Sequence, residues 1–402
     1  MAASDGTVVI GGGLAAAHVV QALRENAAAE PITVIADEDL PPYERPPLSK
    51  DFLQGKQPAE AAIVHDAGWY AAHDATLVLG EHAAAIDRER HLVRLESGAE
   101  HAYGQLVLAT GADSRRLDLP GAGLPGVHVL RRMDDARALK EALATGGRLA
   151  VVGAGWIGLE VAASARQAGM DVTVVAPGTT PLGTILGEEV GGHFAALHRA
   201  HGVELRLGTQ VTGILEHAGR AAGLATSAGE VPADVVLIAV GAVPATGLAE
   251  AAGLAVDNGV LVDSSLRSSD PDILAVGDVA NAENTRLGRL RVEHWDNAIR
   301  QGTLAAQVIL GHDDRYDWLP YFFTDQFDLG MEYVGRAGRG AETVIRGSLV
   351  SGEFIAFWLE DGVVCAAMNV NIWDVNDTLR GIVGRRVDAA RLADPEVPLP
   401  EL

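Results

Sequence analysis

The chain is short of cysteine, of positive charge and of long hydrophobic runs, and each shortage excludes a class of protein. Cys365 is the single cysteine, which excludes an internal disulfide, a cysteine-based metal cage and a CxxC redox pair. Lysine and arginine number 31 against 54 acidic residues, and the resulting net charge of −23 would repel nucleic acid. Charges or glycines interrupt every apolar stretch of about 18 residues, so we expect no membrane span.

The remaining composition is that of a globular protein with several domains. Hydrophobic residues make up 48% and charged residues 21% of the 402 positions, close to ordinary globular usage. At roughly 100–200 residues per domain, this length suggests two to four domains. No basic region precedes the first apolar run, so we expect no secretory signal and a cytoplasmic location.

Two glycine-rich turns of the same kind occur about 140 residues apart. The first follows a β-branched run at residues 7–10 and precedes a helix-forming stretch at 14–25. The second, at 153–158, follows the apolar run at 148–152 and also precedes a helix and a strand. A strand, a glycine turn, a helix and a second strand form the βαβ unit that binds dinucleotides. Two copies therefore predict two dinucleotide-binding modules in one chain.

Three small residues of each turn have separate roles. The first permits the tight turn, the second lets the pyrophosphate approach the backbone, and the third lets helix and strand pack closely. The start of the helix then attracts phosphates through its free N–H groups and partial positive charge. The first copy has Gly11, Gly13 and Ala16 at these positions, and the second has Gly153, Gly155 and Gly158.

The residues after the second strand of each unit bear on which nucleotide is bound. An acid there can bind an adenosine ribose and favours NAD, and an arginine favours the 2′-phosphate of NADP. Asp37, Glu38 and Asp39 follow the first copy, whereas Ala176 and its neighbours supply neither determinant in the second. The sequence therefore does not decide between NAD and NADP.

Further strands end in turn residues that are suited to a cofactor. An apolar strand runs into Thr110-Gly111, a second ends at Gly241, and a third ends at Gly277-Asp278. An acid at the carboxyl end of a strand can bind a ribityl or ribose hydroxyl. In this order, around two glycine loops, these turns strengthen the prediction of two nucleotide sites.

One segment is more specific than any of these, namely PYERPPLSK at residues 42–50. Together with Ala109-Thr110-Gly111, GAGWIGLE at 153–160, Gly277-Asp278 and EHWDNA at 293–298, it gives the chain a clear resemblance to a known group. The chain resembles the FAD-dependent pyridine nucleotide-disulfide reductase superfamily, and within it the ferredoxin reductase branch of putidaredoxin reductase-like and biphenyl dioxygenase reductase-like proteins. The resemblance extends over nearly the whole chain.

The resemblance implies an α/β fold with two Rossmann-like dinucleotide-binding domains of glutathione reductase type and a small α+β C-terminal domain. The FAD-binding domain is expected at 1–112 and 242–320, the NAD(P)H-binding domain at 113–241, and the C-terminal domain at 321–402. FAD and NAD are the expected cofactors, with NADP not excluded, and no metal site is expected. The expected assembly is a monomer or homodimer.

The resemblance also implies roles for individual residues. Gly11, Gly13 and Ala16 would surround the FAD pyrophosphate, Asp278 would bind the ribityl chain, and Lys50 would lie beside the isoalloxazine ring. The full set of implied cofactor-binding residues is Gly11, Gly13, Leu14, Ala15, Ala16, Asp37 or Glu38, Arg45, Lys50, Ala83, Ala109, Thr110, Gly111, Arg116 (or Arg115), Gly153, Gly155, Trp156, Ile157, Gly158, Gly241, Gly277, Asp278, Glu293, His294, Trp295 and Phe323.

Lys50 and Glu160 are the expected catalytic residues. Negative charge develops toward the pyrimidine end of a flavin that accepts hydride, and a lysine ammonium would stabilise that charge. Lys50 is one of three lysines in the chain, and the resemblance makes Glu160 its partner. A solvent-exposed lysine remains the alternative, although the prolines beside Lys50 stiffen the backbone around it.

The single cysteine selects among the branches of this superfamily. Disulfide reductases need two cysteines beside the flavin, whereas Cys365 lies in an expected β-hairpin near residues 354–368 and is interpreted as a packing residue. Electrons would then leave the flavin singly for an external ferredoxin that serves an oxygenase. The alternatives are an NAD(P)H:quinone or small-acceptor oxidoreductase, and a redox-sensing protein like apoptosis-inducing factor. Docking an acidic ferredoxin would need a basic patch. The candidates for it are Arg286, Arg289 and Arg291, with Arg300, Arg336 and Arg339 nearby in sequence.

Overall fold

The computed structural model describes residues 6–402, so the first five residues of the segment expected to lack a secretory signal lie outside it. The chain divides into two compact units. The first unit comprises the residues up to Arg45, Ala59–Asp113 and Ala242–Pro320, and the second comprises Pro46–Pro58, Ser114–Gly241 and Tyr321–Leu402. The expected FAD-binding domain included Pro46–Pro58, and the C-terminal domain was expected to be separate. In the structure, both segments belong to the unit that contains the second glycine loop.

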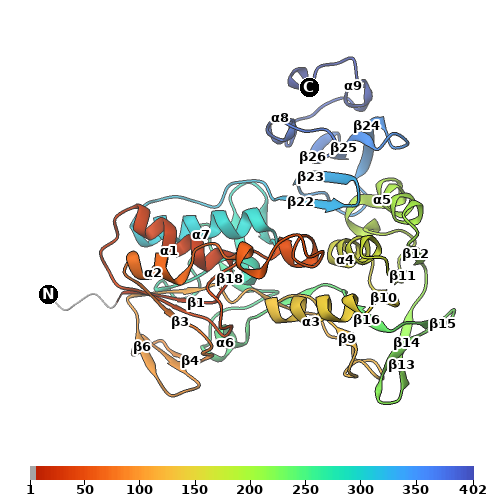
Figure 1. The fold of residues 1–402 in the computed structure, drawn as a ribbon. Helices are drawn as coiled ribbons and strands as arrows, with labels where there is room; N and C mark the ends of the chain where they lie inside the picture. The colour runs from red at the N-terminus through yellow and green to blue at the C-terminus, as the bar shows by residue number, and fades with distance from the viewer. Residues whose placement is uncertain (1–5) are drawn as a thin grey trace. The chain divides into compact units, whose positions relative to one another are not determined.

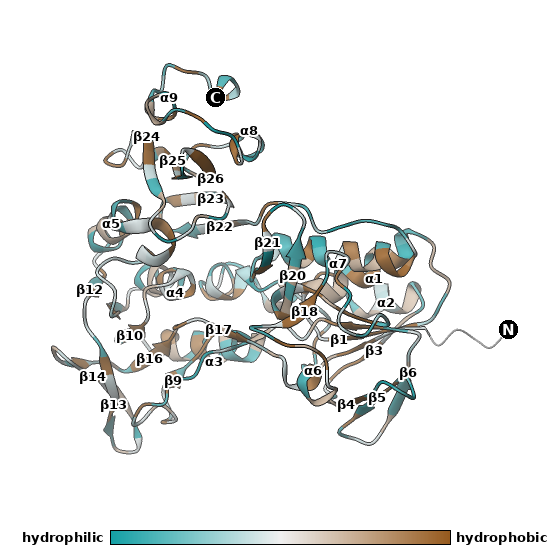
Figure 2. Cartoon of the chain, turned by 180° about the vertical axis from the view of Figure 1, so that it is seen from behind, coloured by the Kyte–Doolittle hydropathy of each residue, from teal (hydrophilic) through white to brown (hydrophobic). Residues whose placement is uncertain are grey.

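The first unit is organised around a five-stranded sheet in which every described pair is parallel. Its strand order is β19-β7-β1-β2-β3, with β1 at Thr7–Ile10, β2 at Ile32–Ile35, β3 at Ala75–Val78, β7 at Gln105–Leu108 and β19 at Ile273–Ala275. The sequence of β1, TVVI, is buried at all four positions because neighbouring layers cover both faces of the sheet. Figure 2 shows β1 and β3 in the brown of hydrophobic residues.

Two helices, α1 (Leu14–Glu25) and α7 (Trp295–Ile309), lie together on one side of this sheet (Figure 1). They approach closely at Gly302, where an added Cβ would lie 2.5 Å from the carbonyl oxygen of Ala15. The alanines of α1 and this glycine therefore set the spacing of the two helices. The other helical segments of the unit are α2 (Ala67–Ala72), α6 (Gly247–Ala251), η2 (Ala59–Ala62) and η3 (Gly277–Val279).

Smaller sheets complete the first unit. One is an antiparallel sheet of β4 (Ala83–Asp87), β5 (Leu92–Leu95) and β6 (Glu100–Ala102). Another joins β18 (Val260–Val262), β20 (Ala280–Asn284) and β21 (Gly288–Arg291). A two-stranded pair, β8 (Ala112–Ser114) with β17 (Ala242–Pro244), forms where the chain passes between the units.

The second unit contains another parallel sheet, in the order β12-β11-β10-β16-β9. Its strands are β9 (Val127–His128), β10 (Arg148–Val152), β11 (Asp171–Val175), β12 (Glu204–Arg206) and β16 (Val235–Ile238). The helices of this part are α3 (Met133–Ala144), α4 (Trp156–Gln167) and α5 (Gly183–Ala200). A small antiparallel sheet follows, made of β13 (Val211–His217), β14 (Arg220–Thr226) and β15 (Gly229–Pro232).

The C-terminal part of the second unit is an antiparallel sheet in the order β22-β23-β26-β25-β24. Its strands are β22 (Tyr321–Gln326), β23 (Leu329–Gly335), β24 (Glu342–Ser348), β25 (Glu353–Glu360) and β26 (Val363–Val370), followed by α8 (Asn376–Ile382), α9 (Ala389–Ala393) and η4 (Leu399–Glu401). The expected hairpin is confirmed: β25 and β26 pair through a turn at Asp361 and Gly362, both with positive φ.

The α/β fold with two Rossmann-like modules and an α+β C-terminal part is confirmed. Each parallel sheet has a strand, a glycine turn and a helix in the predicted order, and the antiparallel sheet follows both. Among residues 6–402, no helix is long and apolar enough to cross a membrane.

Candidate functional site

The predicted flavin residues of the first unit gather at the carboxyl edge of its parallel sheet. Gly11 follows β1, Ala109 to Gly111 follow β7, and Gly277-Asp278 follow β19, while β1 lies between β7 and β2. The carboxyl ends of parallel strands, where the strand order reverses, form the usual crevice for a nucleotide. The topology thus brings together residues that are distant in sequence.

In the turn after β1, the backbone at Gly11 approaches the neighbouring strand end too closely for a side chain. Gly11 has φ +131, and a Cβ there would lie 2.1 Å from the carbonyl oxygen of Ala109. Gly13 is the N-cap of α1, and no side chain caps that helix end. The Arg45 guanidinium lies against it, since a Cβ on Gly13 would be 2.9 Å from Nη1 of Arg45. A helix start with an arginine beside it suits the phosphates of a dinucleotide.

The acids after β2 differ in their surroundings. Glu38 accepts a hydrogen bond from the buried Tyr43 hydroxyl, with Tyr43 Oη 2.8 Å from Oε2. Asp37 is exposed. Leu14, Ala15 and Ala16 are buried in the first turns of α1 and form its packing face.

The residues after β19 and before α7 are held by short-range bonds. The Gly277 amide, at φ +71, donates to Gln301 Oε1 at 2.8 Å. Burial raises the pKa of Glu44, which lies in the PYERPPLSK segment (residues 42–50), and a hydrogen bond with Trp295 opposes that shift. His294 is the N-cap of α7, directly after the exposed Glu293.

The second glycine turn combines tight closure with open space. A Cβ on Gly153 would lie 2.3 Å from the Ala239 carbonyl oxygen, and one on Gly158 would lie 2.4 Å from the Gly153 carbonyl oxygen. A Cβ on Gly155, the N-cap of α4, would meet no atom within 4 Å. The first and third glycines are therefore required by the fold, whereas the second leaves room above the helix start for a phosphate.

Other predicted cofactor residues occupy varied positions. Trp156 packs edge-on against Phe322 and Phe194, with ring centroids 5.0 and 5.8 Å apart, whereas Ile157 is 42% exposed. Gly241 and Arg116 are exposed. Ala83, the first residue of β4, is buried and lies opposite Leu95.

The two expected catalytic residues are brought together in the second unit. Lys50 Nζ lies 3.4 Å from Glu160 Oε1 and 3.4 Å from Asp325 Oδ2. The ammonium also lies 4.5 Å from the centroid of the Phe323 ring. The Lys50 and Glu160 side chains are 14% and 7% exposed, while that of Asp325 is 60% exposed. Lys50 is thus a largely enclosed cation with a buried carboxylate partner, and the solvent-exposed alternative is wrong.

Two hydroxyl groups that the sequence analysis did not single out bind the same carboxylate. Ser49 Oγ donates to Glu160 Oε2, and Thr324 Oγ1 donates to Glu160 Oε1, each at 2.5 Å. They come from the turn η1 (Pro46–Ser49) and from β22, so three separate segments meet at Glu160. Hydrogen bonds of this kind offset the cost of burying a charge. The motif PYERPPLSK contains Ser49, but no feature of the sequence predicts a contact between Thr324 and Glu160.

Two of the candidate docking arginines form hydrogen bonds within the first unit. Arg291 is 13% exposed, donates to the Asp278 carbonyl oxygen at 3.1 Å and pairs with Glu293. Arg289 donates to the carbonyl oxygens of Val262 and Asn281. These bonds tie β21 to β18, β20 and η3, and the low exposure of Arg291 makes it a poor candidate for partner docking. Arg289 and Arg286, which lies at the turn between β20 and β21, are both exposed.

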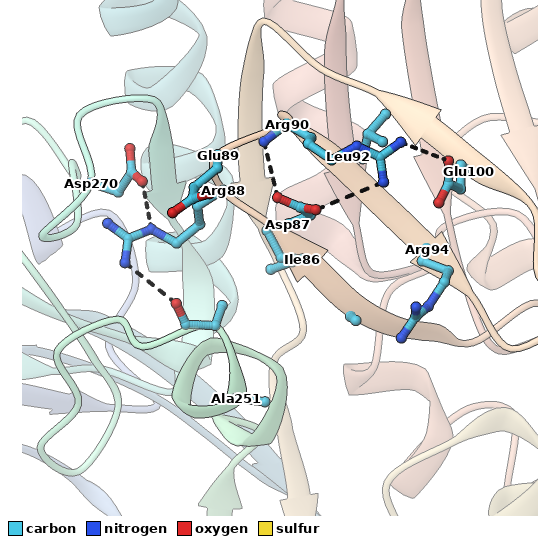
Figure 3. Close-up of a pocket in the computed structure, with 12 residues that line it drawn as sticks. Ile86, Asp87, Arg88, Glu89, Arg90, Leu92, Arg94, Glu100, Ala251 and Asp270 are labelled. Carbon is cyan, nitrogen blue, oxygen red and sulfur yellow. Dashed lines mark hydrogen bonds and ion pairs between the residues drawn. The ribbon is translucent and has the colours of Figure 1, made fainter.

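A separate hollow of about 710 Å³ lies in the first unit between the β4–β5 hairpin and α6 (Figure 3). Arg88 Nε lies 2.6 Å from Asp270 Oδ2, and Arg90 reaches Asp87 and Glu100. The predicted cofactor residues do not line it. Its paired charges join the hairpin to the rest of the unit.

Cys365 is placed as a packing residue in β26. Burial and the neighbouring Glu360 raise the pKa of its thiol to about 11, and its sulfur donates to the Trp358 carbonyl oxygen at 3.1 Å. A thiol with that pKa is almost entirely protonated at neutral pH and is a poor nucleophile. Among residues 6–402, no group of three or more histidine, cysteine or acidic side chains is arranged to hold a metal ion.

Replacing Cys365 with serine is therefore expected to leave NADH-dependent dye reduction within about twofold of the unmodified protein, because no thiolate is available for relay. Steady-state rates of both proteins at pH 7 would test this. A large loss of activity, without a change in the unfolding midpoint, would show that the thiol takes part in the reaction.

Comparisons with known proteins agree with this arrangement. Residues 6–302 match the family described as pyridine nucleotide-disulphide oxidoreductase, and residues 321–402 match the family described as reductase C-terminal. The chain is 42% identical over 400 residues to the anthranilate 1,2-dioxygenase system ferredoxin–NAD(+) reductase component of Burkholderia cepacia, covering 98% of each. It is 35% identical to putidaredoxin reductase of Pseudomonas putida, covering 100% of this chain and 97% of the relative.

Solved structures give the same result. The chain aligns with the crystal structure of the covalent putidaredoxin reductase–putidaredoxin complex at a TM-score of 0.95 and 34% identity, covering 99% of this chain and 98% of that one. The ferredoxin reductase for the CYP199A2 system of Rhodopseudomonas palustris aligns at a TM-score of 0.94 with 34% identity, covering 98% and 99%. The family model that matches residues 6–302 and the relatives above show that this chain, with its two glycine cradles and its Lys50–Glu160 pair, belongs to the pyridine nucleotide-disulphide oxidoreductase family.

Proposed function

We propose that this chain is an FAD-dependent NAD(P)H:ferredoxin reductase that passes electrons to an iron–sulfur protein of an oxygenase system. The observation that carries the proposal is the presence of two nucleotide cradles in a chain with a single cysteine, whose thiol pKa is raised by burial. The family relatives named as ferredoxin–NAD(+) reductase components support it. A cytoplasmic location, where NADH is available, is part of the same proposal.

The residues of the first unit fit FAD, which when bound takes up two electrons from a nicotinamide and returns them one at a time. Gly11 and Gly13 leave the backbone accessible to the pyrophosphate, and Arg45 adds positive charge there. Asp37 or Glu38 would bind the adenosine ribose, and Asp278 the ribityl chain, at the ends of β2 and β19. No metal is needed for any of these roles.

The residues of the second unit would bind the nicotinamide dinucleotide. Gly153, Gly155 and Gly158 form the phosphate cradle at the start of α4. Ala176 follows β11 where an acid or arginine would select the nucleotide, so both NADH and NADPH belong in the test. Lys50, oriented by Glu160, supplies positive charge that favours the reduced flavin.

The function is tested by comparing electron acceptors. The purified protein, with FAD bound, is mixed with NADH or NADPH, and the loss of flavin absorbance is followed by stopped flow. Turnover is then measured with a [2Fe–2S] ferredoxin, with a quinone and with a small dye. We expect fast reduction by NADH and turnover with the ferredoxin that exceeds turnover with the quinone.

A docking variant sharpens this comparison. Arg286→Glu is expected to slow reduction of an acidic ferredoxin while sparing the dye, because the charge that it reverses lies at an exposed turn. Turnover with quinone alone would identify a small-acceptor oxidoreductase. Slow turnover with every acceptor, together with a change of oligomeric state on NADH addition, would identify a redox-sensing protein. A protein that retains no flavin would overturn the proposal.

A further inference from the structure

A continuous line of buried polar side chains in the second unit leads from α5 to the carboxylate of Glu160. His198 Nε2 lies 2.8 Å from Gln326 Oε1, and Gln326 Nε2 lies 3.2 Å from Thr324 Oγ1. Thr324 Oγ1 lies 2.5 Å from Glu160 Oε1. The four residues are 0%, 1%, 1% and 6% exposed in the same order. Polar groups buried this deeply carry a high cost unless every link is made.

The chemistry of the groups fixes the direction of each hydrogen bond. A carboxylate only accepts, so the single proton of the Thr324 hydroxyl points to Glu160. The hydroxyl oxygen must then accept from the Gln326 amide nitrogen, which turns the amide oxygen toward His198. That oxygen also only accepts, so His198 Nε2 carries the proton. All three bonds therefore donate toward Glu160.

His198 is suited to be the neutral end of this line. Burial lowers the pKa of His198, and among the described residues its Nδ1 has no hydrogen-bond partner. Protonation would place an unsatisfied N–H there, whereas a bare ring nitrogen costs less. His201, the residue directly after α5, also lowers the pKa of His198.

Glu160 thus receives donors from three directions. Thr324 binds one oxygen, Ser49 binds the other, and the Lys50 ammonium lies 3.4 Å away. Bonds that point the same way polarise one another, so the Thr324 bond is stronger with Gln326 and His198 behind it.

We propose that Thr324, Gln326 and His198 are positioning residues, which hold the Glu160 carboxylate fixed in place as the partner of Lys50. The proposal rests on the function proposed above, because it assigns these residues to the orientation of the Lys50 charge. Thr324 and Gln326 act through Glu160 and, with His198, form a support behind it rather than a contact with substrate.

The first test is a double-mutant cycle between Thr324 and Lys50. Thr324→Val removes the hydroxyl with little change of shape, and Thr324→Ser keeps it. We expect Thr324→Val to slow flavin reduction by NADH roughly 10-fold, as loss of one hydrogen bond to a charged group would. Thr324→Ser should restore most of the rate. In a Lys50→Met background, Thr324→Val should change the rate by less than about twofold, since the interaction it supports is gone.

A matched control and a second readout distinguish a loss of Glu160 positioning from a nonspecific effect of removing a hydroxyl group. Thr226, the last residue of β14, donates its hydroxyl to the Gly229 carbonyl oxygen at the start of β15, away from this line, so Thr226→Val should leave the rate unchanged. The second readout is the ring-nitrogen spectrum of ¹⁵N-histidine-labelled full-length protein. It should show His198 with its proton on Nε2, and that proton resonance should shift in Thr324→Val but not in Thr324→Ser.

The outcomes are distinct from those of the functional test. An equal loss of rate from Thr324→Val with and without Lys50 would overturn the proposal, as would a His198 proton on Nδ1. A protein with no ferredoxin activity would overturn the proposed function, yet its histidine spectrum would still report whether the line of donors exists.

Discussion

Gly155→Val is expected to weaken binding of NADH by at least about 100-fold, a loss of about 2.7 kcal/mol, while leaving the fold intact. A side chain at this position meets no protein atom within 4 Å, and Gly155 has a φ of −86, which valine can adopt. The new methyl groups would occupy the space above the first turn of α4, where the pyrophosphate must approach the backbone. Titration calorimetry with NADH and urea unfolding of both proteins would measure the two quantities.

The neighbouring glycine provides the opposite control. Gly158→Ala would place a Cβ 2.4 Å from the Gly153 carbonyl oxygen, so this variant should lower the free energy of unfolding as well as nucleotide affinity. Unchanged NADH affinity in Gly155→Val would mean that the nucleotide does not use this helix start.

Lys50→Met is expected to slow flavin reduction by NADH by about 100-fold, because it removes the charge that we propose stabilises the reduced cofactor. It should also reduce the free energy of unfolding by about 3 kcal/mol, since Glu160 would remain buried without its cation. Stopped-flow absorbance and urea unfolding would measure these effects.

A double variant distinguishes the two consequences. In Lys50→Met with Glu160→Gln, the buried carboxylate is gone, so stability should recover while the rate stays low. Lys50→Arg keeps the charge but changes its shape, and an intermediate rate is expected. A normal rate in Lys50→Met would exclude Lys50 from the chemistry.

Much of the fold and both cradles could be predicted because they depend on local sequence. A short β-branched strand, a glycine turn and an alanine-rich helix specify a βαβ unit within about 30 residues. The same holds for the β25–β26 hairpin, which its alternating pattern and Asp361-Gly362 turn define. Their assignment to cofactors came from the family resemblance rather than from the turns alone.

The support around Glu160 could not be predicted, because its members meet only through tertiary structure. Thr324 is 164 residues from Glu160, and His198 is 128 residues from Gln326. In the sequence, His198 lies in a segment with His193 and His201 and shows no regular spacing with them. Arg291 illustrates the reverse case: a basic run suggested a docking surface, but its guanidinium group is 13% exposed and donates to a backbone carbonyl oxygen.

The interleaved path of the chain has a consequence for dissection of this protein. The second unit is assembled from three stretches of sequence, and each of them gives Glu160 a ligand or contains it: Ser49, Glu160 itself and Thr324. A fragment cut at Ser114 and Gly241 would retain the glycine loop, but its Glu160 carboxyl group would lack the hydrogen bonds from Ser49 and Thr324. Such a fragment would therefore not represent the nucleotide site of the intact protein.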